Sequence, residues 1–167
     1  WFGERQYTKA HVWFSEALEI NRGSGHRRGE VFNLHNIGDC LFRLGEEARA
    51  HVAFTEAAEI AKGFGLSRET TFNELYLGYI DAVHGDPVGG RALIERCIKD
   101  SERLKDQDTQ LMGCWLLGKL MIHLGDVKGG LDELSTALAR AEEMQNHWMA
   151  ADLKEAIDEA RTKGDGE

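Results

Sequence analysis

The stretch Leu34–Ile60, LHNIGDCLFRLGEEARAHVAFTEAAEI, decides the fold because its landmarks return along the chain at a fixed interval. The repeat also extends toward the N-terminus, since residues 10–20 are identical to residues 50–60 at most positions. A constant period of this length is typical of a repeat protein. Two glycines of the stretch mark the period of 40 residues, in the series Gly38, Gly78, Gly118 and the series Gly45, Gly85, Gly125.

Each full repeat is predicted to be a pair of helices. Apolar residues recur at i, i+3, i+4 and i+7 in Leu34–Leu41 and again in Ala50–Ala57, which is the spacing of one face of an amphipathic helix. Extending this pattern along the chain predicts helices over residues ~5–22, 27–44, 47–63, 67–84, 87–104, 107–124, 127–145 and 148–163.

The two glycine series have different expected roles. Gly38 lies in the middle of a helix, where glycine costs about 1 kcal/mol relative to alanine, so its recurrence needs a compensating reason. We expect close helix approach, with the large residue of the partner helix (Phe54, Ile94 or Leu134) packing directly on the glycine backbone. Gly45 and its equivalents precede an acidic residue, which indicates a helix C-terminus followed by the start of the next helix.

The repeats predict the domain organisation. Residues 145–163 are expected to form a capping helix, because Asp158 replaces the mid-helix glycine. Trp148, Leu153, Ile157 and Ala160 would then be buried, with Asp152, Glu155, Asp158 and Glu159 in water. The chain starts inside a repeat and without methionine, so we expect an excerpt of a longer protein. A single solenoid is predicted over 1–167: 1–24 as the second helix of an incomplete repeat, repeats at 25–64, 65–104 and 105–144, the capping helix at 145–163 and a tail at 164–167.

The order of the landmarks resembles that of the tetratricopeptide repeat family. The resemblance implies an all-α, right-handed superhelical solenoid of antiparallel helix pairs with about eight helices, whose first helices line a concave, ligand-binding side. The period of 40 exceeds the ~34 residues of the commonest form. Longer units of this kind resemble those of kinesin light chains, cell-polarity adaptors and bacterial signalling proteins. The matching residues are Leu34, Ile37, Gly38, Leu41, Gly45, Ala50, Phe54 and Ala57.

Beside the core stripe of each first helix runs a second stripe, rich in aromatic residues, which we expect to bind a peptide or a partner helix. An alternative is that Phe72, Tyr79 and Trp115 belong to the core between repeats. The resemblance implies that Asn36 holds a bound peptide backbone. The candidate residues are Phe32, His35, Asn36, Asp39, Phe42 and Arg43 in the first full repeat; Phe72, Leu75, Tyr76 and Tyr79 in the second; and Met112, Trp115, Lys119 and His123 in the third.

Composition and motifs argue against several other classes. The net charge is −9 and no basic stripe is visible, which disfavours a nucleic-acid partner. The three cysteines have no CxxC spacing, and no signal segment or long apolar run occurs, which favours a reducing, cytoplasmic compartment without membrane attachment. No HExxH, nucleophile elbow or phosphate-binding glycine loop is present, so we predict no catalytic residue, no cofactor and no metal.

Three functions follow. The first is a non-enzymatic module in a cytoplasmic protein that binds a partner polypeptide along the aromatic stripe. The second is a regulatory segment acting in cis on a bacterial signalling enzyme such as a serine/threonine kinase or cyclase. The third is homo-oligomerisation, in which the orphan N-terminal helix pairs with a second copy through Trp13, Phe14 and Leu18.

Overall fold

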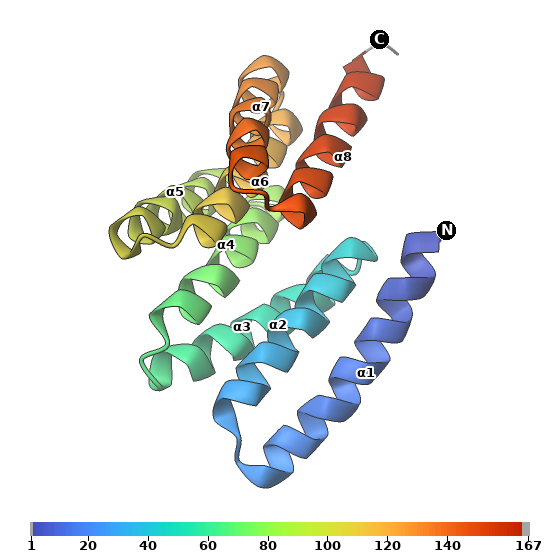
Figure 1. The fold of residues 1–167 in the computed structure, drawn as a ribbon, viewed down its shortest axis with the longest axis vertical. Coiled ribbons are helices and arrows are strands. Elements are labelled where there is room, and N and C mark those ends of the chain that lie inside the picture. Colours follow the sequence, from blue (N-terminus) through green and yellow to red (C-terminus); the bar gives the residue numbers. More distant parts are fainter. Residues whose placement is uncertain (1, 165–167) are drawn as a thin grey trace. The chain divides into compact units, whose positions relative to one another are not determined.

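A computed structural model describes residues 2–164, and within them all regular structure is helical (Figure 1). The all-α prediction is therefore confirmed, and the expected helix ranges agree with the observed ones to within three residues. The predicted tail at 164–167 lies outside the described residues except for Gly164, which ends the last helix. The helices are α1 (Phe2–Ser24), α2 (Arg27–Arg43), α3 (Glu47–Gly63), α4 (Ser67–His84), α5 (Pro87–Leu104), α6 (Gln107–His123), α7 (Val127–Glu143) and α8 (His147–Gly164).

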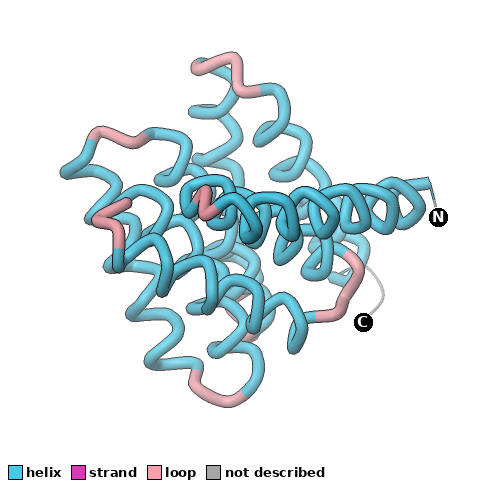
Figure 2. Tube along the Cα trace, turned by 90° about the horizontal axis from the view of Figure 1, so that it is seen from below, coloured by secondary structure: helices cyan, strands magenta, loops and turns pink. Residues whose placement is uncertain are grey.

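Every connection between these helices is a short turn of the same design (Figure 2). One residue takes a positive φ, and the N–H of the next residue donates to the carbonyl oxygen five residues before it, at 2.9 Å each time. This is the hydrogen bond that closes a helix C-terminus when a left-handed residue follows it. The positive-φ residues stand twenty positions apart along the chain: Gly25, Gly45, Gly65, Gly85, Lys105, Gly125 and Gln145.

The three glycines expected to end helices, Gly45, Gly85 and Gly125, thus have the predicted role. Two turns place a side-chain-bearing residue where glycine is favoured, at Lys105 (φ 55°) and Gln145 (φ 56°). A left-handed conformation brings Cβ close to the following carbonyl, so these two turns carry a small local cost.

The residue after each left-handed position begins the next helix. In the later part of the chain this residue is an N-cap whose side chain accepts the backbone N–H three residues on: Asp86 from Gly89, Asp106 from Thr109, Asp126 from Gly129 and Asn146 from Met149. Earlier, His26 and Glu46 stand at the same place without a side-chain cap bond. The turns therefore share one backbone conformation but differ in whether a side chain accepts a hydrogen bond from the first N–H groups of the next helix.

The chain divides into two compact units, Trp1–Ile80 and Asp81–Glu167. In the first, α2 packs against both α1 and α3, and the described core includes Leu34, Leu41, Phe54 and Tyr76. In the second, α5 packs on α6, α6 on α7 and α7 on α8, and α8 also contacts α6.

Close helix approach at a mid-helix glycine is confirmed for Gly38 and Gly118, whereas the pairing of Gly78 with Ile94 stays a prediction. A Cβ on Gly38 would lie 2.6 Å from a ring carbon of Phe54, and one on Gly118 would lie 2.7 Å from Cγ of Leu134. Gly130, which stands where the first full repeat has Ala50, has the same explanation: its Cβ would lie 2.7 Å from the carbonyl oxygen of Gly118. The α6 and α7 backbones thus touch where alanine would hold them apart.

The predicted burial of α8 is right for Leu153, Ile157 and Ala160 and wrong for two residues. Trp148 is 54% exposed, whereas Asp152 is only 9% exposed. The buried face runs through Met149, Leu153 and Ile157, so Trp148 falls on another side of the helix. None of the helices, as far as the chain is described, has an apolar stretch long enough to cross a membrane.

Candidate functional site

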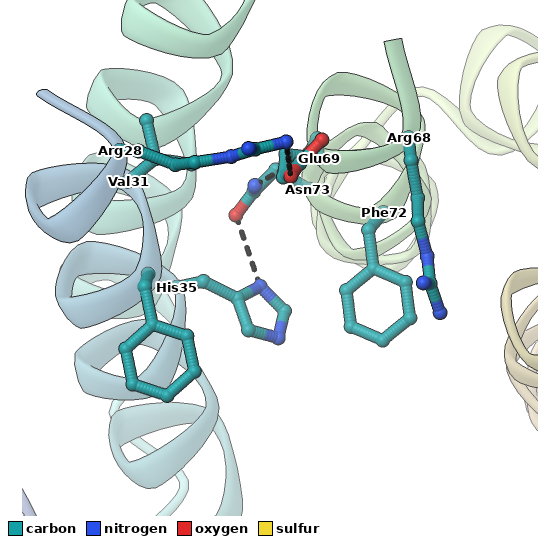
Figure 3. Close-up of a pocket in the computed structure, with 8 residues that line it drawn as sticks. Arg28, Val31, His35, Arg68, Glu69, Phe72 and Asn73 are labelled. Atoms are coloured by element: carbon teal, nitrogen blue, oxygen red, sulfur yellow. Dashed lines mark hydrogen bonds and ion pairs between the residues drawn. The ribbon is translucent and has the colours of Figure 1, made fainter. Parts of the chain in front are cut away.

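The candidate site is a pocket of about 460 Å³ in the first unit, between α2 and α4 (Figure 3). Binding pockets for small groups typically measure ~300–1,000 Å³, so this one has room for a large side chain or a small molecule. Its walls come from about two turns of each helix. The lining residues are Arg28, Val31, Phe32 and His35 from α2 and Arg68, Glu69, Phe72 and Asn73 from α4.

The two walls are built from equivalent positions of successive repeats. Arg28 and Arg68 are 40 residues apart, and so are Phe32 and Phe72. Each arginine lies four residues before its phenylalanine, which places the two side chains on one face of their helix. The repeat therefore supplies the pocket with two similar walls, each offering a ring and a guanidinium group.

The apolar part of the pocket is accessible. Phe32 is 62% exposed although Val31 beside it is buried, and its ring meets Phe14 of α1 edge-on with centroids 6.1 Å apart. On the opposite wall the Phe72 ring is half-buried and lies 4.7 Å from the His35 ring. An exposed phenylalanine held by one ring contact in a pocket wall is a feature of binding surfaces rather than of cores.

The charged groups of the pocket are two arginines and one carboxylate. Arg28 reaches from α2 toward α4, where its Nη2 lies 3.5 Å from Oε1 of Glu69 (Figure 3). The Arg28 side chain is 71% exposed, so the pair is screened by water and holds the arginine weakly. The lining carries one more positive than negative group in a chain whose net charge is −9.

His35 sits at the inner end of the pocket in a fixed tautomer. Asn73 donates from Nδ2 to the carbonyl oxygen of Glu69 at 2.7 Å, which leaves its Oδ1 as an acceptor for Nδ1 of His35 at 3.1 Å. The proton is therefore on Nδ1, and Nε2 keeps its lone pair on the side away from Asn73 (Figure 3). Burial among aromatic rings lowers the pKa of His35, against the opposing effects of the Asn73 bond and the Asp39 carboxylate.

Several other predicted binding residues are engaged with one another. Arg43 donates from Nε to both carboxylate oxygens of Asp39, at 3.1 and 3.0 Å, and Tyr76 donates to Oδ1 of Asp39 at 2.9 Å. The Arg43 guanidinium also lies 5.5 Å from the centre of the Tyr7 ring. This network ties α1, α2 and α4 together beyond the pocket.

The remaining candidates divide between core and surface. Asn36 donates to the backbone oxygen of Phe32 at 2.7 Å, one turn before it. In the second unit Lys119 lies 4.9 Å from the Trp115 ring centre, and His123 is exposed. Buried candidates, each at most 9% exposed, are Phe42, Leu75, Tyr76, Tyr79, Met112 and Trp115.

The pocket thus brings together three predicted residues, Phe32, His35 and Phe72. It adds five that the sequence interpretation missed: Arg28, Val31, Arg68, Glu69 and Asn73. The repetition of arginine at 28 and 68 was the available signal, since it has the same period as the glycines.

The helix proposed to self-associate is partly covered. Leu18 is 6% exposed, and Phe14 contacts Phe32 within the same unit, whereas Trp13 is 67% exposed. His, Cys, Asp and Glu side chains nowhere form a group of three or more suited to a metal ion in the described part of the chain. No family model matches the chain, and none of the curated proteins does.

Proposed function

We propose that the chain is a non-enzymatic interaction module of the tetratricopeptide type, a right-handed helical solenoid, and that the pocket between α2 and α4 binds a segment of a partner polypeptide. The pocket carries the proposal: it is open, it presents Phe32 and Phe72 on facing walls, and Asn73 holds His35 in place by a hydrogen bond. Polypeptide recognition commonly rests on one or two anchoring side chains that enter such a pocket.

The repeat architecture favours this use. Two successive first helices carry an arginine and a phenylalanine at equivalent repeat positions, so a bound chain meets a ring and a guanidinium on each wall. The expectation that ligands bind along the first helices comes from the family resemblance, and the pocket lies on those helices.

The test is selection of binding peptides from a displayed random library on the purified protein, followed by titration of the enriched peptides. Phe32→Ala should weaken binding at least ~10-fold, because truncating an anchor contact typically costs more than about 1.4 kcal/mol. Phe64→Ala is the matched control, since Phe64 is 61% exposed, follows α3 and does not line the pocket. Enriched peptides that bind both variants like the wild type contradict the proposal.

Self-association through α1 and regulation in cis stay predictions. Trp13 and Ile20, 67% and 72% exposed, are seven residues apart and share a face of α1. Light scattering over a dilution series tests whether α1 forms a dimer through these two residues. Trp13→Ala should shift such a dimer toward monomer, and a wild-type chain that is monomeric at every concentration contradicts self-association.

A further inference from the structure

We infer that α1 pairs in antiparallel orientation with α1 of a second copy of this chain, forming a two-fold symmetric dimer. This inference goes beyond the peptide-binding function proposed above and does not depend on the pocket. It gives the self-association predicted through Trp13 a contact surface, an orientation and a register. The contact surface is one side of α1, called here the α1 stripe: Gly3, Gln6, Ala10, Trp13, Ala17 and Ile20.

The α1 stripe is uncovered in the described part of the chain. All of its residues are exposed or half-buried, and Trp13 and Ile20 are 67% and 72% exposed. The equivalent positions forty residues later, Ala50, Ala53 and Ala57, are at most 7% exposed, because α3 packs against α2 there. The α1 helix contacts α2 by a different side (Figure 1). Two large apolar side chains on one uncovered helix face are a feature of contact surfaces.

The sizes of the stripe residues favour an antiparallel pair of α1 helices. The residues alternate between intervals of three and four, which are the a and d positions of a coiled coil. The a positions are small (Gly3, Ala10 and Ala17), whereas the d positions include Trp13 and Ile20. A parallel pair would place Trp13 against Trp13 and leave the small residues facing each other. An antiparallel pair places Trp13 of one copy over Ala10 of the other, and Ile20 over Gly3, so large and small side chains alternate along the contact.

The charges beside the stripe favour the same orientation. Lys9 and Glu16 are both exposed and lie seven residues apart, so they flank the stripe on the same side. When Trp13 lies over Ala10 of the other copy, Lys9 of each copy lies beside Glu16 of the other, and the dimer contains this ion pair twice. In a parallel pair neither residue would face an opposite charge. Flanking charges of this kind set the orientation of paired helices.

A head-to-tail contact between α1 and α8 fits the stripe less well. The α8 helix corresponds to a first helix of the repeat, but Asp158 stands at the position of Gly38, which contacts α3 in the first unit. Asp158, Lys154 and Arg161 are all exposed on that side of α8. Covering charged side chains with an apolar stripe costs free energy unless each charge is paired. The α1 pair instead leaves its charges at the rim of the contact.

The experiment measures the dimer dissociation constant of the full chain by analytical ultracentrifugation at about 50 mM salt, where surface charges are less screened. Lys9→Glu and Glu16→Lys should each weaken the dimer at least ~10-fold, because each replaces two attractive contacts by two repulsive ones. Trp13→Ala should weaken it by a similar or larger factor. The controls are Lys62→Glu, an equal charge change at an exposed side chain of α3, and Phe64→Ala, at a 61%-exposed ring outside α1. Both should leave the constant unchanged.

Mixing the charge variants tests the orientation and the register. An equimolar mixture of Lys9→Glu and Glu16→Lys should form a heterodimer at least ~10-fold more tightly than either variant associates alone, since opposite charges then face each other again. The double variant Lys9→Glu/Glu16→Lys should regain the wild-type constant for the same reason. Circular dichroism of each variant confirms that the helices are retained.

Several outcomes overturn the inference. They are a wild-type chain that stays monomeric up to about 1 mM, a dimer that Phe64→Ala weakens and Trp13→Ala does not, and charge variants that fail to recover affinity on mixing. Tight binding of a synthetic Arg27–Arg43 peptide by a monomeric chain also overturns it, because α1 would then take a first helix as α3 does. Binding of library-selected peptides in Lys9→Glu is measured separately and should persist, so the pocket and the dimer can fail independently.

Discussion

The Phe54 ring occupies the space that a side chain on Gly38 would need, since an added Cβ would lie 2.6 Å from Cε1 of that ring. Phe54 is itself fully buried, so the ring has no free direction in which to retreat. The contact makes one glycine on α2 and one aromatic on α3 a single packing unit.

Gly38→Ala should therefore destabilise the chain, although alanine is the better helix former by about 1 kcal/mol. Overpacking of a dense core costs about 1–3 kcal/mol, which exceeds this gain. Gly63→Ala is the control, because an added Cβ there meets nothing within 4 Å in α3. Urea denaturation should show a lower midpoint for the first variant and an equal or higher one for the second; a stabilised Gly38→Ala would contradict the packing argument.

The two turns that lack glycine can be improved. Lys105→Gly and Gln145→Gly should each raise the unfolding free energy by about 0.5–1 kcal/mol, because relief of the left-handed conformation exceeds the entropy that glycine adds to the unfolded chain. The reverse change, Gly45→Ala at φ 75°, should lower it by a similar amount. Thermal unfolding of the three variants is the measurement, and a loss of stability in both glycine variants would show that the turns are not strained.

Removal of the N-cap side chain should destabilise the chain at the turns that have a side-chain cap bond and not at those that lack one. Asp126→Ala removes the bond from Gly129 N–H and should cost about 1 kcal/mol, whereas Asp126→Asn keeps an acceptor and should cost less. Glu46→Ala, at the corresponding place before α3 with no side-chain cap bond, should change stability by less than about 0.5 kcal/mol. Chemical denaturation of the set measures the difference, and equal losses for Asp126→Ala and Glu46→Ala would argue against the cap.

Acid should weaken the first unit through His35. Burial holds its folded-state pKa below the ordinary value of 6.5, so as pH falls through 6.5 the unfolded chain takes up a proton that the folded chain does not. The unfolding free energy then decreases with decreasing pH in the interval below 6.5.

His35→Gln removes this titration and should flatten that part of the curve relative to the wild type. His123→Gln, with an exposed side chain, is the control. Denaturation at about pH 7.5 and about pH 5.5 gives the comparison, and an unchanged pH dependence in His35→Gln would show that other groups cause it.

The Asp39 network should be structural. Asp39→Ala leaves the buried Tyr76 hydroxyl and the largely covered Arg43 guanidinium without their shared acceptor, which costs about 2–4 kcal/mol for a charged partner. Asp39→Asn keeps one acceptor oxygen and should cost less. Thermal unfolding measures both, and peptide binding at about 10 °C below the lower melting temperature should remain if the network lies outside the site.

The fold was readable from the sequence because its signals are local and repeated. Gly45 and its equivalents mark helix ends through a backbone conformation that side chains oppose, and Gly38 marks a close approach that only its partner Phe54 explains. The turn at Lys105 could be placed only by the period, since lysine itself gives no signal for a left-handed residue.

The site was only partly readable. Phe32, His35 and Phe72 were found from helical spacing, but the same spacing selected Asp39 and Tyr76, which satisfy each other internally. Helical spacing predicts which residues share a face of a helix, but it does not predict which residues of the neighbouring helix contact that face. The predicted stripe begins at Phe32, the first aromatic residue of α2, one turn after Arg28, and so it does not include that arginine.

The regular turns also govern how the chain tolerates changes in length. The positive-φ residues follow one another every twenty positions. The buried face of each helix therefore begins at the same distance from the preceding turn. Deleting one residue inside α3 would turn the rest of that helix by about 100°, which would swing Ala57 and Ala61 out of the core. An insertion in a turn, or of a whole helix pair, leaves the register of each helix intact, so this chain can be lengthened by complete repeats more readily than by single residues.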